Sequence, residues 1–169
     1  MPRYLLDRRQ PDSIREFRAA AGERFTDGLS SAKEGRRTAA VYLCGHAAEL
    51  TLKAAYFAVL GFDATRPISM GDLQAARNAG LMNYQIVWPN HGKFHNVRAW
   101  ADLLVEHRSR NPGRSYARPG FSDEVRLRGR RIEPLWSETL RYYRNVAYSH
   151  EVDRVIKAAG WLMAKSIEL

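Results

Sequence analysis

Cysteine and long apolar runs are scarce in this 169-residue sequence. Its single cysteine, Cys44, excludes an intramolecular disulfide framework and a cysteine-rich zinc module. No apolar stretch is long enough to span a bilayer. The first ten residues carry three arginines and lack the apolar core of a secretory signal. We therefore expect a cytoplasmic protein with no membrane segment.

Strand patterns, internal repeats and low-complexity tracts are missing as well. No run of four to eight β-branched residues alternates with polar ones. Disorder is excluded by the 45% apolar content and by the 4 tryptophans, 8 tyrosines and 6 phenylalanines. The length fits one domain, which we place over 1–169.

Apolar residues instead recur at three- and four-residue steps, the period of an amphipathic helix. Ser13, with Glu16 three residues on, forms a capping-box pattern that opens the first helix. The second helix is apolar nearly all round, which indicates the most buried position. The period predicts helices over about 14–33, 38–60, 93–107, 123–148 and 149–167, with a short one near 73–79. An alternative for 123–148 is a break at Gly129 and a restart with Pro134 in the first turn. The expected fold is all-α, an antiparallel bundle of four to five main helices with an N-terminal arm over 1–12 and a basic loop over 108–122.

Acidic residues are few beside the basic ones. Lysine and arginine total 27 against 18 acidic residues, a net charge of +9, and 22 of the 27 are arginine. Such a charge favours phosphate polymers or an acidic partner, and a guanidinium can donate two parallel hydrogen bonds to one phosphate. Genomic base composition explains the arginine content equally well, because composition alone identifies no site.

The segment 140–151 is the richest in chemically useful side chains. It holds Arg141, Arg144, Asn145, Tyr148 and His150. A helix junction explains the charges, with Ser149 as the N-cap of the last helix, but it gives no reason for the histidine. Arg144 and His150 are six residues apart, about 120° around a continuous helix. They share a face only if the helix breaks between them or if two chains each contribute a copy.

Three segments together resemble the HEPN family. Arg144 and His150 form an Arg-x5-His motif with Asn145 directly after the arginine, similar to the Arg-x(4–6)-His motif of that family. Residues 41–54 resemble its central helix, and 91–97 resembles its Gly-His-x-Leu entry to the following helix, with Asn-Val where Asp-Leu is frequent. The likeness covers about 35–167.

The resemblance implies an all-α homodimer without a cofactor. Active members are metal-independent ribonucleases, often toxins or defence proteins, whose two motifs meet in a cleft at the dimer seam, so an antitoxin is a further expected partner. Silent members bind a partner protein, a nucleotide or nucleic acid. Carried over, the motif makes Arg144 and His150 the catalytic pair and Asn145 a polar helper.

These residue types suit RNA cleavage, in which the 2′-hydroxyl attacks the adjacent phosphorus. Histidine can take the 2′-hydroxyl proton or protonate the leaving 5′-oxygen. Arginine can stabilise the negative charge of the transition state. Such a site cannot act on DNA, which lacks the 2′-hydroxyl.

The second helix carries a polar stripe of Tyr42, His46, Glu49, Lys53 and Tyr56. A buried glutamate needs a partner. Glu49 and Lys53 can form an i,i+4 pair, or Glu49 can reach an arginine of 141–144 and hold it in place. On the latter hypothesis Glu49, Arg141 and Tyr148 support the catalytic pair. For His46 a structural role in the core is favoured over catalysis.

The segment 108–131 is the expected RNA-binding surface. Tyr116 and Phe121 lie between its arginines and suit stacking on single-stranded bases, although a solvated loop and a charged helix face explain the segment equally well. Its arginines are Arg108, Arg110, Arg114, Arg118, Arg126, Arg128, Arg130 and Arg131. His91 and His95 have metal-ligand spacing, but without a cysteine or carboxylate nearby a structural role is favoured and no metal site is predicted.

Overall fold

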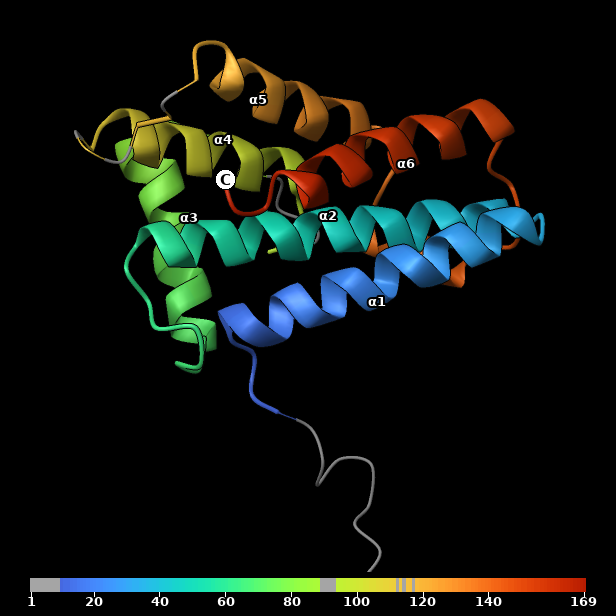
Figure 1. Cartoon of the computed structure of the whole chain (residues 1–169), viewed down its shortest axis with the longest axis horizontal. Coiled ribbons are helices and arrows are strands. Elements are labelled where there is room, and N and C mark those ends of the chain that lie inside the picture. The colour runs from blue at the N-terminus through green and yellow to red at the C-terminus, as the bar shows by residue number, and fades with distance from the viewer. Residues whose placement is uncertain (1–9, 89–93, 112, 114, 117) are drawn as a thin grey trace, which may run out of the picture.

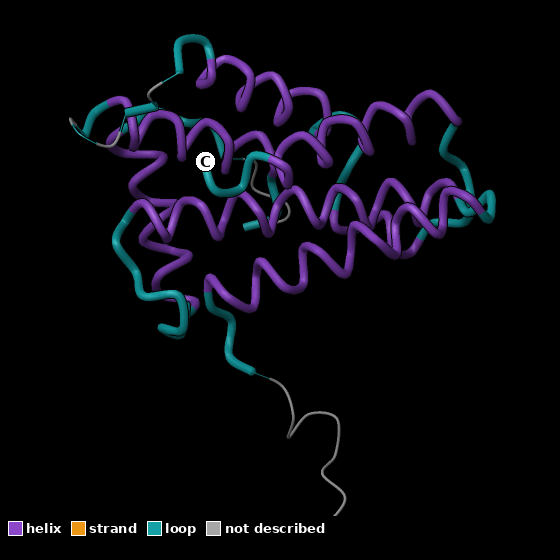
Figure 2. The backbone as a smooth tube through the Cα atoms, in the orientation of Figure 1, coloured by secondary structure: helices purple, strands orange, loops and turns teal. Residues whose placement is uncertain are grey.

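The computed structural model describes residues 10–88, 94–111, 113, 115–116 and 118–169, and all regular structure in them is helical (Figure 2). The all-α prediction is confirmed. The described residues form six α-helices and one 3-10 helix, more than the four to five main helices expected. They are α1 (Ile14–Lys33), α2 (Arg37–Val59), α3 (Met70–Asn83), α4 (Val97–Ser109), α5 (Phe121–Ile132), the 3-10 helix η2 (Glu138–Tyr142) and α6 (Ser149–Ala164).

Helix α2 is the centre of the bundle, as its apolar surface predicts. Helix α1 runs beside it along its length, and α4 and α6 pack on other sides (Figure 1). Two glycines permit these contacts. A Cβ at Gly28 of α1 would lie 2.5 Å from Cys44 Sγ of α2, and one at Gly45 would lie 2.1 Å from the Trp136 ring. Close approach at both positions therefore requires glycine.

The first helix follows its sequence signals closely. The Ser13 hydroxyl accepts a hydrogen bond from the Glu16 amide at 3.2 Å, so α1 begins at Ile14 as predicted. Helix α3 is longer than the expected 73–79. Ser69 and Asp72 form a reciprocal capping box that starts it three residues earlier.

The predicted helix over 123–148 is wrong. Helix α5 ends at Ile132, η2 follows, and residues 143–148 lie outside any helix before α6 begins at Ser149 with Tyr148, not Ser149, as its N-cap. Nor does the helix restart at Pro134, which lies in a turn. A tertiary contact explains the break, because the buried Trp136 donates its indole N–H to the Tyr42 carbonyl at 2.9 Å and anchors the chain on α2.

Two other predictions concern segments outside the helices. Of the N-terminal arm over 1–12, residues 1–9 lie outside the described residues. The basic loop is 110–120 instead of 108–122, because α4 extends to Ser109 and α5 begins at Phe121. Among the helices of the described residues, none has the length and apolar character needed to cross a membrane.

Candidate functional site

Arg144 and His150 both lie on the protein surface, on either side of the break before α6. We call residues 142–150 the junction. The break is the condition under which the two motif residues can share a face. Within the part of the chain that the structure describes, the Arg144 guanidinium makes no ion pair or hydrogen bond, which leaves all its donors open to solvent or a ligand.

Four large apolar or aromatic side chains close to this pair in the sequence are exposed. Tyr142 is 74% exposed, Tyr143 62%, Val146 55% and Tyr148 65%. The Tyr148 ring stacks on the His150 ring, with 5.8 Å between centroids and 8° between planes.

The Asn145 side chain holds the backbone of the junction in place, and its role as the polar helper that the motif implied stays a prediction. Its side-chain oxygen accepts a hydrogen bond from the Thr38 amide at 3.1 Å, and its nitrogen donates one to the Gly35 carbonyl at 2.9 Å. The Thr38 hydroxyl accepts hydrogen bonds from the amides of Val146 and Ala147 at 2.8 and 2.9 Å. Four hydrogen bonds thus fix the junction to the start of α2.

The hypothesis that Glu49 holds an arginine of 141–144 is wrong. Its fully buried carboxylate lies 2.5 Å from Lys53 Nζ and 3.1 Å from His95 Nδ1, so the i,i+4 alternative is correct and His95 is a second partner. Burial alone would raise the pKa of the Glu49 carboxyl, but Lys53 and His95 outweigh it and hold that pKa below its ordinary value. Arg141 instead lies in η2, with its guanidinium 4.8 Å from the Tyr142 ring centre.

His95 also joins this buried pair to η2. Its Nε2 lies 3.2 Å from a Glu138 carboxylate oxygen, while its Nδ1 faces Glu49. His91, its predicted neighbour in a weak metal motif, lies outside the described residues. Within the described ranges, no three histidine, cysteine or acidic side chains are grouped so as to hold a metal ion.

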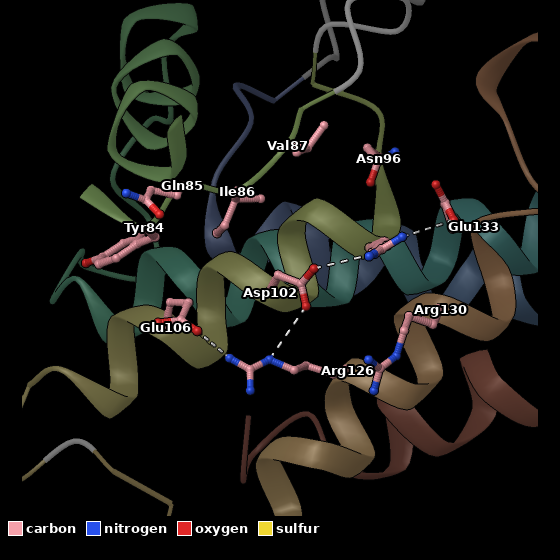
Figure 3. Close-up of a pocket in the computed structure, with 11 residues that line it drawn as sticks. Tyr84, Gln85, Ile86, Val87, Asn96, Asp102, Glu106, Arg126, Arg130 and Glu133 are labelled. Carbon is pink, nitrogen blue, oxygen red and sulfur yellow. Dashed lines mark hydrogen bonds and ion pairs between the residues drawn. The ribbon is translucent and has the colours of Figure 1, made fainter. Parts of the chain in front are cut away.

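A cavity of about 680 Å³ lies between α4, α5 and residues 84–87. Figure 3 shows Arg126 between Asp102 and Glu106, and this arginine pairs with both carboxylates. Arg98 also pairs with Asp102, at 3.6 Å, and with Glu133, at 3.9 Å. Burial raises the pKa of the Asp102 carboxyl. The positive charges of Arg126 and Arg98 lower that pKa but do not outweigh burial. These pairs join α4 to α5 across the cavity.

Several arginines of the predicted RNA-binding surface are thus engaged within the chain. Phe121 is 1% exposed and cannot stack on a base. Arg130 and Arg131 are exposed and hold no ion pair within the described residues, whereas Arg114 lies outside those residues. The others have internal contacts: Arg126 with Glu106, Arg128 with Glu124, and Arg108, Arg110 and Arg118 over the rings of Tyr116, Tyr84 and Phe121. RNA binding by this surface stays a prediction.

Two features of the structure near the candidate site were not predicted from the sequence. One is the contact of His95 with Glu49 and Glu138, which joins residues distant in the sequence, and the other is the exposure of Tyr142 and Tyr143. The exposure of these tyrosines was not predicted because the sequence pattern placed them in a continuous helix. Comparisons of the chain with protein-family models, curated proteins and solved structures found no match.

Proposed function

We propose that this protein is a metal-independent endoribonuclease of the HEPN type and that the junction is its active site. The observation that carries the proposal is the break before α6, which leaves Arg144 and His150 exposed on one fixed segment. A continuous helix would have pointed them about 120° apart. The exposed tyrosines beside them supply flat surfaces on which unpaired bases can stack.

In the proposed reaction the RNA supplies its own nucleophile. Its 2′-hydroxyl attacks the adjacent phosphorus, the bond to the 5′-oxygen breaks, and a 2′,3′-cyclic phosphate and a 5′-hydroxyl remain. His150 takes the 2′-hydroxyl proton or protonates the leaving oxygen, a contribution of about 10²–10⁴-fold. Arg144 donates hydrogen bonds to the non-bridging oxygens, whose negative charge grows in the transition state.

A homodimer would complete this site. One histidine cannot be acid and base at once, whereas two junctions facing each other supply one of each. The exposed side chains of Tyr142, Tyr143, Val146 and Tyr148 are the apolar surface such a contact would cover.

The same surface supports a second candidate function, a silent module that binds a partner protein such as an antitoxin. The observation in its favour is the use of Asn145. One donor and one acceptor of the amide that the motif offers to catalysis hold the junction on α2. A module of this kind needs the apolar surface but does not need His150.

The deciding experiment is RNA cleavage in the presence of a metal chelator. We expect the wild type to leave 2′,3′-cyclic phosphate ends and His150→Ala to lose about 100-fold or more in rate. Lys157→Ala, an exposed change on the same helix, is the matched control and should cleave like the wild type. An RNA with a single 2′-deoxy nucleotide at the scissile position should resist cleavage. A folded wild-type dimer that cleaves no RNA would refute the enzyme and favour the silent module.

A further inference from the structure

A second cavity, of about 240 Å³, lies against the junction, and we call it the junction cavity. Three consecutive residues of the junction, Val146, Ala147 and Tyr148, line it. The ring of Tyr148 also stacks on the His150 ring, with 5.8 Å between their centroids. The cavity and the proposed acid–base group of the ribonuclease therefore contact the same residue.

Most of the side chains that line the junction cavity are apolar. Besides Val146 and Ala147 they come from α2, from the turn after α5 and from η2, namely Val41, Pro134, Leu135 and Leu140. The volume is below the roughly 300–1,000 Å³ of sites that enclose a whole drug-sized ligand. The cavity therefore suits one planar ring system and not a whole nucleotide.

Thr38 gives this cavity a hydrogen-bond donor. The residue is 3% exposed, and its hydroxyl accepts hydrogen bonds from the amides of Val146 and Ala147. Both lone pairs of the hydroxyl are thereby used. Among the residues that the structure describes, its own O–H has no acceptor. Because an unsatisfied buried donor is costly, an acceptor in the cavity would stabilise it.

Glu151 gives the cavity acceptors. One of its carboxylate oxygens accepts a hydrogen bond from the Tyr148 amide at 2.8 Å, and the other has no partner within the described ranges. An ionised carboxylate has lone pairs for further donors. Thr38 and Glu151 bond to the consecutive amides of Ala147 and Tyr148, whose nitrogens are three bonds apart. The hydroxyl and the carboxylate therefore lie less than about 10 Å from each other, a separation that one base can bridge.

We propose that the junction cavity binds a guanine base of the RNA substrate. One edge of guanine carries two neighbouring donors, the N2 amino group and N1–H, followed by the O6 acceptor. The Glu151 carboxylate accepts hydrogen bonds from both donors, the Thr38 hydroxyl donates to O6, and the apolar side chains pack on the ring.

No other RNA base presents this order of groups. Adenine and cytosine place an unprotonated ring nitrogen beside their amino group, and its lone pair would face the carboxylate. Uracil has one N–H between two carbonyl oxygens. The arrangement of Glu151 and Thr38 therefore favours guanine over the other three bases.

The expected consequence is cleavage beside guanosine, and this consequence rests on the ribonuclease function proposed above. Tyr148 contacts both the cavity and His150. The nucleotide whose base occupies the cavity is then a neighbour of the scissile phosphate. The binding of guanine itself does not depend on cleavage.

Calorimetry on the full chain with guanosine monophosphate as the probe tests the recognition of the base. The monophosphates of adenosine, cytidine and uridine are the controls, and inosine monophosphate lacks only the amino group of guanine. We expect guanosine monophosphate to bind at least about tenfold more tightly than the three controls, with inosine monophosphate in between. Equal binding of adenosine monophosphate would overturn the proposal, as would no binding of guanosine monophosphate at about 5 mM.

A matched pair of variants locates the bound base. Glu151→Gln keeps a side-chain acceptor for the Tyr148 amide, so the start of α6 is retained, but it removes the carboxylate. It should weaken the binding of guanosine monophosphate about tenfold or more. Asp153→Asn removes an exposed carboxylate of α6 that does not line the cavity, and it should bind like the wild type. Unchanged binding by Glu151→Gln, or an equal loss in both variants, would contradict the proposed contact.

Sequencing of the ends left on an RNA of mixed sequence tests the role of the cavity in cleavage. The wild type and Asp153→Asn should cut beside guanosine, and Glu151→Gln should lose that preference. A wild type that binds guanosine monophosphate selectively but cuts without regard to guanosine would overturn the substrate role, because the cavity would then hold a free guanine nucleotide. Selective binding with no RNA cleavage at all would instead refute the ribonuclease and leave the recognition of guanine intact.

Discussion

Replacement of Lys53 by methionine should destabilise the fold strongly, because Lys53 neutralises a carboxylate at the centre of the bundle. Glu49 is 0% exposed and Lys53 is 6% exposed by side chain. Lys53→Met keeps most of the apolar stem but leaves Glu49 with His95 alone. Removal of one partner of a buried pair costs about 3–5 kcal/mol, a large part of the roughly 5–15 kcal/mol that stabilises a typical domain.

The loss should depend on pH with a definite sign. In the wild type the pKa of Glu49 lies below its ordinary value. Its contribution to stability is therefore present above the unfolded pKa of about 4.3 and is lost as the pH falls through the lower folded pKa. Without Lys53, burial raises that pKa instead. Protonation of Glu49 then removes the unpaired buried charge from the variant. The difference in unfolding free energy between the two proteins should therefore narrow from pH 7 to about pH 4.5.

Urea unfolding followed by circular dichroism measures both effects. With an m-value of about 2 kcal/mol per M, the midpoint at pH 7 should fall by about 2 M at constant m. The double variant Glu49→Leu/Lys53→Met should recover most of the loss, since an apolar pair of similar volume is often as stable as a buried ion pair. A double variant no more stable than Lys53→Met would refute the argument, and so would a difference that does not change with pH.

Three smaller predictions follow from individual contacts. Asn145→Ala should cost about 1–2 kcal/mol in urea and reduce RNA cleavage with it, whereas Asn145→Asp, which keeps the acceptor for Thr38, should lose less of both. Gly45→Ala places a Cβ 2.1 Å from the Trp136 ring and should lower stability by about 1–3 kcal/mol, while Gly22→Ala, with open space around it on α1, should be neutral or stabilising in the same thermal melt. Burial raises the pKa of the Cys44 thiol to about 12, so a disulfide reagent at pH 8 should label the native chain at a small fraction of the rate seen in urea.

Local signals accounted for the parts of the fold that were predicted well. Helix α1 begins and ends at the expected residues, because the Ser13 cap and the apolar period act over a few residues. The error over 123–148 has the opposite cause. Trp136 bonds to Tyr42, and Asn145 bonds to Thr38, across about a hundred residues of chain. A period computed within a window contains no information on such contacts, so a helix was expected where tertiary bonds impose an irregular backbone.

The buried group of Glu49, Lys53 and His95 was likewise predicted only in part from the sequence. A glutamate on an apolar helix must be paired, and the sequence alone is enough to predict that it has a partner. The identity of the second partner is not, because His95 comes from a separate segment 46 positions away. Each nitrogen of His95 faces a carboxylate, Glu49 on one side and Glu138 on the other. Lys53 and His95 thus hold the buried Glu49 carboxylate on the central helix, and the contact of His95 with Glu138 fixes η2 immediately before the junction.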